Sequence, residues 1–419
     1  MNVHVNKPVP ITFKMVVDAY QRVRRGGQGV GVDGESWEKF DAKLQDNLYI
    51  IWNRLASGTY HPAAVREIEI PKKDGSKRKL GIPTLRDRIA QSVVKDYMEK
   101  HIDHKFHENS YGYRPLKSSK AAIEQVRKNC TSRDWVIDLD ISRFFDEIDQ
   151  ELLIKAVERM IEEKWVRMYV GRWLAMKIQD KGGVLHDRQG KGTPQGGVIS
   201  PLLANIFLHY ALDKWLEKHY SHISFVRYAD DMIIHCSTEQ EAKMLLNAIK
   251  ERLSQVKLQL NEKKTHIVYC KDYRRRQQHH KVQFDFLGFS YQPRTAKSKH
   301  QEGSSFTAFT AEISQDNQKK IREEINKSIN WRNTRMEITD IADKLNSKLR
   351  GWINYFGIYA KRNLRRTLQR LDCRLLKWLR DKHKLKGIRK ATVYLRTLML
   401  ENKSMFFHWE KGYGYFIKK

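Results

Sequence analysis

The stretch "FVRYADDMII", residues 225–234, places two adjacent aspartates between two short apolar runs that are typical of β-strands. The pattern predicts a tight hairpin with Asp230 and Asp231 at its tip. Two neighbouring carboxylates repel each other and resist burial, so the pair needs open water or a shared cation. Because Tyr-x-Asp-Asp is a short motif, the rest of the chain must supply the cation chemistry.

A second acidic strand end supplies that context. The stretch "DLDISRFFD" ends an apolar strand with Asp138 and Asp140, which are two residues apart and therefore on one face. If this strand lies beside the hairpin, Asp140 and Asp230 can share two divalent cations roughly 3.5–4 Å apart. Mg²⁺ suits such carboxylate ligands, and Mn²⁺ can replace it. In the alternative interpretation, which the two motifs together disfavour, the acids only end strands and pair with Arg143 and Arg227.

The composition indicates a polyanionic partner. The chain has 419 residues and a formal net charge of +30, so nucleic acid is the leading candidate and an anionic membrane the rival. The longest uncharged run, residues 192–212, contains less apolar sequence than the ~20 residues of a spanning helix. The N-terminus lacks the apolar core of a signal peptide. We therefore expect no membrane association and a cytoplasmic protein.

The four cysteines are widely scattered, which favours neither a disulfide framework nor a zinc site. We expect small buried thiols in a reducing compartment, namely Cys130, Cys236, Cys270 and Cys373.

Helical and strand patterns interleave through the middle of the chain without strict βαβ alternation. An α+β domain around an antiparallel sheet is therefore expected. The Gly-rich stretch 26–34 joins two helices and lacks a preceding strand, so a connector is favoured over a phosphate-binding loop. Helices are predicted near 12–25, 36–55, 84–104, 117–129, 150–178, 198–219 and 238–256, and strands at 66–70, 78–82, 135–141, 265–270 and 282–287.

The composition changes after Tyr291. Residues 292–305 are polar and loop-like, and residues 311–419 carry 27 Lys and Arg against 11 Asp and Glu. Within them, the stretch 361–380 places apolar residues along one helix face and cations around the rest. We expect that basic face to touch RNA phosphates through Arg362, Arg365, Arg366, Arg370 and Lys377.

Two further elements suit triphosphate chemistry. The basic hairpin "PKKDGSKRKLGIP", residues 71–83, places Lys72 and Arg78 beside an Asp-Gly turn, where strands hold them more firmly than a tail could. The turn "GTPQGG" opens a long helix, and its glycines permit close backbone approach by a base pair or sugar. Either element alone is a weak signal, and their order around the acidic strands strengthens both.

These elements in this order resemble reverse transcriptases, most closely those encoded by group II introns. The matching stretches span nearly the whole chain: "GVDG", "IPKKDGSKRKLGIPTLRDR", "SYGYRP", "DLDISRFFDEID", "GTPQGGVISPLLANIF", "RYADD", "NEKKTHIV", "FDFLGF" and "LRGWINYFG". The resemblance implies a right-hand polymerase, with fingers and palm around an antiparallel sheet and an α-helical thumb or maturase domain. It divides the chain into a helical N-terminal extension (1–65), fingers and palm (66–291), a linker (292–310) and a basic thumb (311–419).

The resemblance also implies roles for individual residues. Asp140, Asp230 and Asp231 would be the catalytic, Mg²⁺-binding triad, with the backbone carbonyl of Ile141 as a further ligand, and Lys264 would be a proton donor near the pyrophosphate. The dNTP would be bound by Lys72, Arg78, Phe145 and Gln195, of which Phe145 excludes the 2′-hydroxyl of a ribonucleotide. The primer grip would comprise Phe286, Leu287 and Gly288.

The chain also departs from the family pattern. It shows Ser142-Arg143 where relatives often have Lys-Gly, and no His/Cys cluster that could build an HNH endonuclease. We therefore expect an endonuclease-lacking protein that binds an RNA template and primer, dNTPs, a DNA product or target and a structured intron RNA, and that assists splicing and retrohoming in a bacterial cytoplasm. Two alternatives remain open: a splicing-only RNA-binding maturase, and a host-adopted reverse transcriptase for phage defence that copies a non-coding RNA.

Overall fold

A computed structural model gives the fold and describes residues 8–27, 29–71, 75, 77–297 and 304–416. Two compact units divide the chain. The first comprises residues 1–126 and 135–267, and the second comprises residues 127–134 and 268–419. Every helix within the described ranges is too short or too polar to cross a bilayer.

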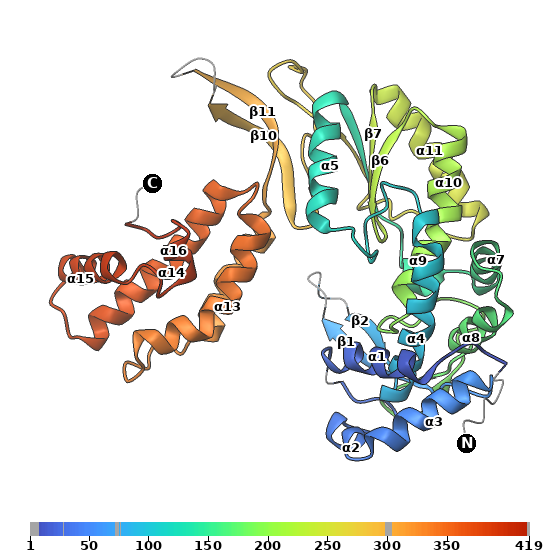
Figure 1. Cartoon of the computed structure of the whole chain (residues 1–419). Coiled ribbons are helices and arrows are strands. Elements are labelled where there is room, and N and C mark those ends of the chain that lie inside the picture. Colours follow the sequence, from blue (N-terminus) through green and yellow to red (C-terminus); the bar gives the residue numbers. More distant parts are fainter. Residues whose placement is uncertain (1–7, 28, 72–74, 76, 298–303, 417–419) are drawn as a thin grey trace. The chain divides into compact units, whose positions relative to one another are not determined.

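The first unit begins with three helices (Figure 1). The helix expected over 36–55 is two helices, because the chain turns at Ala42 and Lys43 before it resumes its helical course. Thr12 caps the first helix by accepting the backbone N–H of Met15 at 3.3 Å. The three helices are α1 (Phe13–Arg24), α2 (Trp37–Asp41) and α3 (Leu44–Ala56).

The Gly-rich stretch 26–34 is a connector, as predicted. A Cβ on Gly31 would lie 2.6 Å from the Cα of Thr84, so only glycine permits this approach to the start of helix α4 (Leu85–Ile102), which Thr84 caps. The buried Arg88 of that helix donates to the carbonyls of Gly27, at 3.2 Å, and Gly29. These contacts tie the N-terminal helices to the body of the first unit.

The basic hairpin forms as predicted, with an antiparallel register from Arg66↔Ile82 to Pro71↔Lys77. It extends into a sheet of order β2-β1-β4-β5, made of β1 (Val65–Pro71), β2 (Lys77–Ile82), β4 (Ile178–Gln179) and β5 (Leu185–His186).

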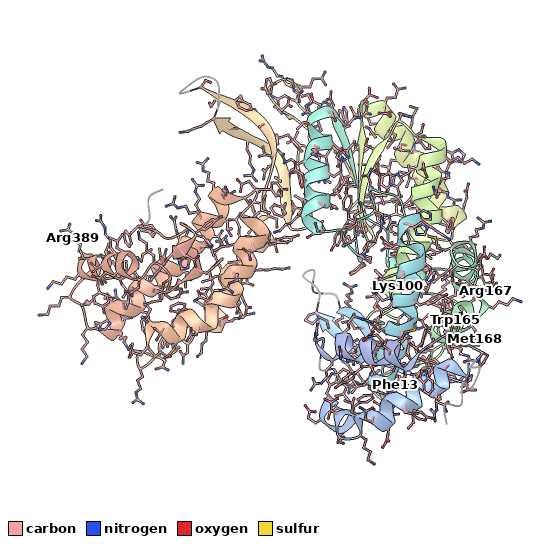
Figure 2. The ribbon with its side chains drawn as sticks, in the orientation of Figure 1. Phe13, Lys100, Trp165, Arg167, Met168 and Arg389 are labelled. Atoms are coloured by element: carbon pink, nitrogen blue, oxygen red, sulfur yellow. The ribbon has the colours of Figure 1, made fainter. Side chains whose placement is uncertain are left out.

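The helix after the hairpin is the central helix of the first unit. Thr84 caps it and, with Tyr60, donates a hydroxyl to the buried carboxylate of Asp87, both at 2.7 Å. Further along it, the ring centroid of Tyr97 lies 4.7 Å from that of Trp165. Figure 2 labels Trp165. The helical elements of this region are α4 (Leu85–Ile102), the short 3₁₀ turn η1 (Asp103–Lys105) and α5 (Ser119–Ser132).

A four-stranded sheet of order β6-β7-β3-β8 contributes its strands β6, β7 and β3 to the core of the first unit, which ends within β8. Strands β3, β7 and β6 pair antiparallel, and their middle residues are buried. This arrangement confirms the expected α+β class. The strands are β3 (Trp135–Leu139), β6 (Ser224–Tyr228), β7 (Asp231–Cys236) and β8 (His266–Tyr269).

The helix expected over 198–219 contains a π-helical segment. It runs as α9 (Ser200–Leu208), the π segment η2 (His209–Asp213) and α10 (Lys214–His219), with Pro201 in its first turn. A π segment accommodates one extra residue and so changes which residues face the core beyond it. The other helices of this region are α6 (Phe144–Glu147), α7 (Gln150–Met160), α8 (Lys164–Leu174) and α11 (Glu239–Gln255).

In the second unit, the expectation of a loop over 292–305 and a linker over 292–310 is wrong for the described residues. β10 (Phe289–Lys297) pairs with β11 (Ser305–Ile313), and the short β9 (Phe284–Phe286) completes the sheet. Phe309, Ala311 and Ile313 are buried at the two-residue period of a strand. Pro293 is tolerated because β9 pairs only with residues 289–291, which leaves one side of β10 without a partner strand at Pro293.

Helices complete the second unit. The longest buries the predicted apolar stripe, namely Leu364, Leu368, Leu371, Leu375, Trp378 and Leu379. Cys130, Cys236 and Cys270 are buried as expected, but Cys373 is exposed because it lies on the polar side of this helix. The helices are α12 (Gln315–Ser328), α13 (Ile338–Phe356), α14 (Lys361–Lys382), α15 (Ile388–Glu401) and α16 (Phe407–Glu410), so the first begins at Gln315 rather than near 311.

A buried carboxylate ties the C-terminal segment to α14. Asp372 accepts hydrogen bonds from the ring nitrogens of His408 and Trp409, at 2.9 and 2.8 Å, and from the backbone N–H of Tyr415 at 2.8 Å. Asp372 is 1% exposed, so water cannot replace its carboxylate as the hydrogen-bond acceptor if the side chain is removed.

The substitution Asp372→Ala should lower the free energy of unfolding by roughly 2–5 kcal/mol, because it leaves several buried donors unsatisfied. Urea unfolding would measure the loss, and hydrogen exchange over residues 406–416 would locate it. The exposed Asp381 of the same helix is the matched control, and Asp381→Ala should change stability by less than about 0.5 kcal/mol. Equal effects of the two substitutions would contradict the assigned role of Asp372.

Candidate active site

The hairpin tip carries the paired aspartates on a two-residue turn. Tyr228 pairs with Asp231, so Ala229 and Asp230 alone connect β6 to β7. Ala229 has a φ of +58°, in the left-handed region that disfavours side chains other than glycine. The turn is tight enough to need this conformation, and neighbouring groups must therefore hold it.

A buried arginine holds the turn. The guanidinium of Arg227 donates to the carbonyl of Ala229 at 3.0 Å and to Asn205 Oδ1 at 2.9 Å. It also forms an ion pair with both carboxylate oxygens of Asp213, at 2.8 Å from Nε to Oδ1. Arg227 and Asp213 are both fully buried. The alternative in which the acids at the strand ends pair with Arg143 and Arg227 is therefore wrong for the described contacts: Arg227 pairs with Asp213, and Arg143 pairs with Glu147 at 2.7 Å.

A close backbone approach supports the turn from outside the hairpin. A Cβ on Gly112 would lie 2.3 Å from the backbone nitrogen of Ala229. The carbonyl of Gly112 accepts the side-chain amide of Asn205 at 2.6 Å, which links this loop to the Arg227 network. The stretch "SYGYRP" around Gly112 thus supports the turn, a role that the sequence analysis did not assign.

The third aspartate lies across the sheet from the hairpin. Leu139 of β3 pairs with Met232 of β7, and the next residues outward in this antiparallel register are Asp140 and Asp231. The backbone of Asp140 is fixed by the hydroxyl of Thr265, at 3.2 Å from its N–H, and by the N–H of Asn261, at 2.9 Å from its carbonyl. Asp140 therefore lies beside the Asp230-Asp231 hairpin, as the sequence predicted.

The carboxylates influence one another electrostatically. Burial raises the pKa of Asp230, and the negative charge of Asp140 adds to the rise. Crowding by protein atoms raises the pKa of Asp231 to about 6, and the charges of Asp230 and Asp140 add to it, although solvent still reaches Asp231. A bound cation stabilises a cluster of carboxylates whose charges repel one another.

As the side chains are placed, no group of three or more His, Cys, Asp or Glu in the described chain forms a metal cage. Carboxylates from adjacent strands suit Mg²⁺, which in such sites takes one or two carboxylates and completes its shell with water and substrate phosphates. Ile141, whose carbonyl the sequence analysis assigned as a further ligand, is buried directly after Asp140.

Two of the proposed dNTP-binding residues form one hydrogen-bonded chain. Arg78 Nε donates to Gln195 Oε1 at 2.7 Å, and Gln195 Nε2 donates to Asp146 Oδ1 at 2.9 Å. The positive charge of Arg78 opposes the rise in the pKa of Asp230, so the basic hairpin faces the aspartate cluster. Lys72 lies outside the described residues.

Glycines of the "GTPQGG" turn make this chain possible. Gly196 has a φ of +111°, and a Cβ on it would lie 2.6 Å from the carbonyl of Gly81. Gly192 packs as closely on the carbonyls of Phe145 and Asp146. Gln195 is thereby held between the basic hairpin and the turn after β3, where Phe145 is half-buried against the ring of Phe144.

Two further side chains approach the aspartates. Lys264 Nζ is 4.0 Å from Asp140 Oδ2, and its charge lowers the pKa of Asp231. Tyr113 has a φ of +56°. Burial is the main cause of the raised pKa of its hydroxyl; the charge of Asp230 adds to the rise and the charge of Arg78 opposes it. The sequence analysis missed Tyr113, although it lies within the "SYGYRP" motif.

The proposed primer-grip residues belong to the second unit. Leu287 and Gly288 have φ values of +47° and +83°, which make a sharp turn between β9 and β10. Tyr355 donates its hydroxyl to the carbonyl of Leu287 at 2.9 Å, and Asn317 donates to that of Gly288 at 3.1 Å. Phe286 is buried in the same turn.

The proposed RNA-binding residues lie on the polar side of α14, also in the second unit. Of these five cations, only Arg365 is half-buried, and the other four are exposed. Arg362, Arg365 and Arg366 line a hollow of about 710 Å³ together with Lys411 and Tyr413.

Comparisons with known proteins assign two parts of the chain to known families. Residues 70–291 match the family described as reverse transcriptase (RNA-dependent DNA polymerase), and residues 318–396 match the maturase-specific domain of group II introns. Protein YkfC of Escherichia coli (strain K12) is 34% identical over 289 residues, which cover 59% of this chain and 74% of YkfC. The group II intron-encoded protein LtrA of Lactococcus lactis subsp. cremoris is 27% identical over 458 residues, covering 87% of this chain and 72% of LtrA. A solved telomerase from Candida albicans has a TM-score of 0.47 at 13% identity, covering 89% of this chain and 67% of that one, which is too low to support an argument.

The match to the polymerase family covers more than half of the chain, so the chain belongs to the reverse transcriptases, and its maturase domain makes it one of the group II intron type. The predicted right-hand fold and enzyme class are confirmed. The protein is an RNA-directed DNA polymerase with the domain that assists splicing, and its catalysis depends on a divalent metal.

The close approach of Gly112 to Ala229 generates a prediction. Gly112→Ala should displace the hairpin tip and lower kcat for dNTP incorporation by roughly 10²-fold, because misplaced catalytic groups are costly at the scale of 1 Å. The matched control is Gly171→Ala in α8, where a Cβ would meet nothing within 4 Å. An active Gly112→Ala enzyme would show that the backbone contact does not position the turn.

Proposed function

We propose that Asp140, Asp230 and Asp231 bind two Mg²⁺ ions and transfer nucleotides from dNTPs to a primer 3′-hydroxyl on an RNA template. The proposal rests on one observation: the strand register places Asp140 beside Asp231, next to Asp230 in the hairpin turn, and the charge of Asp140 raises the pKa of both hairpin aspartates while Arg78 faces them. Divalent ions bound there would activate the 3′-hydroxyl and stabilise the leaving pyrophosphate. Mn²⁺ would substitute for Mg²⁺.

The roles of the protein groups follow from their positions. Arg78 binds the triphosphate through the guanidinium N–H groups that Gln195 does not use, since only Nε donates to Gln195. Gln195, fixed by Asp146, lies against the templating base pair. The Phe145 ring excludes the ribose 2′-hydroxyl by its bulk, and Lys264 donates a proton to the departing pyrophosphate. The backbone carbonyl of Ile141 contributes a further metal ligand, and Lys72 contributes a second cation for the triphosphate.

In the second unit, the turn of Phe286, Leu287 and Gly288 grips the primer, and the polar side of α14 binds structured intron RNA. The support for the second role is the hollow whose walls carry Arg362, Arg365 and Arg366, because guanidinium groups bind phosphate in forked geometry. Arg370 and Lys377 extend this side of the helix. We propose that residues 1–65, 66–291 and 311–419 act as N-terminal extension, fingers and palm, and thumb.

We further propose that the bound RNA is a group II intron, which the protein helps to splice and to insert into DNA. The match of residues 318–396 to the maturase-specific domain supports this role over that of a host-adopted enzyme.

The first test is Mg²⁺-dependent dNTP incorporation on a primed RNA template. Asp230→Asn and Asp231→Asn should each lower kcat by on the order of 10³-fold or more, since each removes a charged ligand from the reacting centre. Asp343→Asn, at an exposed position on α13, is the matched control and should keep full activity. Salt-sensitive RNA binding with no incorporation by the wild type would instead indicate a splicing-only maturase.

The pKa of Asp231 gives a pH prediction. Metal binding needs the carboxylate, so protons compete with the metal below pH 6 and are released when it binds. The affinity for Mn²⁺, measured by electron paramagnetic resonance, should fall up to about tenfold per pH unit below pH 6 and level off above pH 7. An affinity that does not change between pH 5 and 7 would argue against Asp231 as a ligand.

A further inference from the structure

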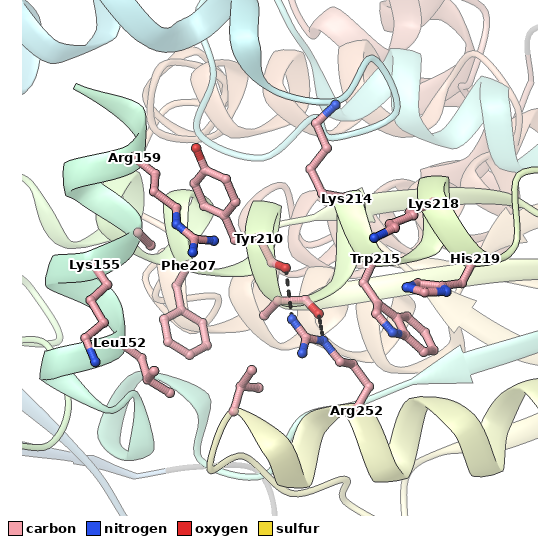
Figure 3. A pocket seen from close by; sticks show the side chains of 13 residues that line it. Leu152, Lys155, Arg159, Phe207, Tyr210, Lys214, Trp215, Lys218, His219 and Arg252 are labelled. Atoms are coloured by element: carbon pink, nitrogen blue, oxygen red, sulfur yellow. Dashed lines mark hydrogen bonds between the residues drawn. The ribbon is translucent and has the colours of Figure 1, made fainter. Parts of the chain in front are cut away.

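A second site of interest lies on the first unit and contains none of the candidate active-site residues. A pocket of about 480 Å³ opens between α7, the continuous α9–η2–α10 helix and the end of α11 (Figure 3). Its walls come from one face of α7, at residues 152, 155, 156 and 159, and from the matching face of the long helix. We call it the α7–α10 pocket.

Cations dominate its rim. Lys155 and Arg159 stand one helical turn apart on α7, and Lys214 and Lys218 stand one turn apart on α10. All four are exposed. Within the described ranges, only Lys214 of these four forms an ion pair, with Glu217 at 2.7 Å. The rim therefore carries positive charge that the protein itself does not neutralise.

Aromatic rings line the interior. Phe207 is buried, whereas Tyr210 and Trp215 are half-buried and line the pocket. Burial raises the pKa of Tyr210, and the positive charges of Arg159 and Lys214 oppose the rise, so these cations lie near its hydroxyl. Partly exposed aromatic side chains beside unneutralised cations are the combination that binds single-stranded nucleic acid.

The remaining cation has a structural task. Arg252 donates from Nε to the carbonyl of Ala211 at 2.9 Å and from Nη2 to that of Tyr210 at 3.2 Å (Figure 3). These carbonyls lie in the π segment η2, where the regular helical pattern is interrupted. Arg252 thus fixes the segment that carries Tyr210 and leaves the binding to the rim.

We propose that the α7–α10 pocket binds a single-stranded segment of RNA, with phosphates on Lys155, Arg159 and Lys218 and a base stacked on Trp215. The other partner of matching charge is an acidic peptide. RNA is favoured because it uses both the cations and the ring faces, whereas carboxylates use only the cations. Binding here needs neither dNTP nor metal, so the site extends beyond the polymerase reaction.

The test uses the full-length chain and a fluorescein-labelled unstructured 20-nucleotide RNA without divalent metal. The double variant Lys155→Glu/Arg159→Glu should bind at least about tenfold more weakly, and its salt slope should fall by about 0.7 for each RNA phosphate that the variant no longer neutralises. The control Lys100→Glu/Lys120→Glu makes the same charge change at exposed lysines of α4 and α5 outside the pocket, and should bind as the wild type does (Figure 2 labels Lys100). Equal reductions of affinity in both double variants would overturn the proposal.

Cross-linking locates the bound RNA directly. RNA containing 4-thiouridine, irradiated in complex with the wild type, should label the peptide that contains Tyr210 and Trp215, and Trp215→Ala should abolish that label. Labelling of other peptides alone would overturn the proposal. Rim substitutions that weaken the binding of poly-L-glutamate rather than that of RNA would also overturn it. Incorporation on a short primed template should be unchanged in both double variants, which separates failure of this site from failure of the proposed polymerase centre.

Discussion

The buried ion pair between Arg227 and Asp213 is the interaction on which the candidate active site depends. It brings an arginine into a fully desolvated position, where only complete hydrogen bonding makes the charge tolerable. One donor is directed to Ala229, whose left-handed backbone conformation is otherwise unfavourable. The hairpin tip, the long helix that carries Asn205 and Asp213 and the loop at Gly112 are thereby joined beneath the aspartates.

The same constraint separates the groups that stabilise the site from those that react. Arg227 has all its described contacts inside the protein, whereas Asp230 and Asp231 have no described basic partner at hydrogen-bond distance and remain reachable by solvent. Had Arg227 paired with them, the site would carry less negative charge and would bind cations more weakly. Among the described residues, Lys264, 4.0 Å from Asp140, and Arg78, whose charge opposes the rise in the pKa of Asp230, offer partial compensation.

The sequence predicted the parts of the fold that local patterns encode. The alternation around Asp230, the Asp-Gly turn of the basic hairpin and the Leu period of α14 each specify an element, and the order of these elements specified the polymerase class. Long-range packing was beyond local patterns. The polar stretch 292–305 resembles a loop because the pairing of β10 with β11, which makes its described part a strand, leaves no signal in the local pattern. Likewise, nothing in the sequence near Asp213 shows that its carboxylate is buried against Arg227.

The π segment η2 fixes a rotational phase along one continuous helix. Asn205, before the segment, and Asp213, within it, bind Arg227 on the inner side of the helix. Tyr210, within the segment, and Lys214 and Lys218, after it, line the pocket on the outer side of the helix. Each residue of an α-helix advances the side-chain direction by about 100°. A one-residue deletion that restored α-helical winding would therefore misalign either the inner carboxylate or the outer cations. Substitutions in this helix preserve the relation between its two sides, whereas a change of its length would break that relation.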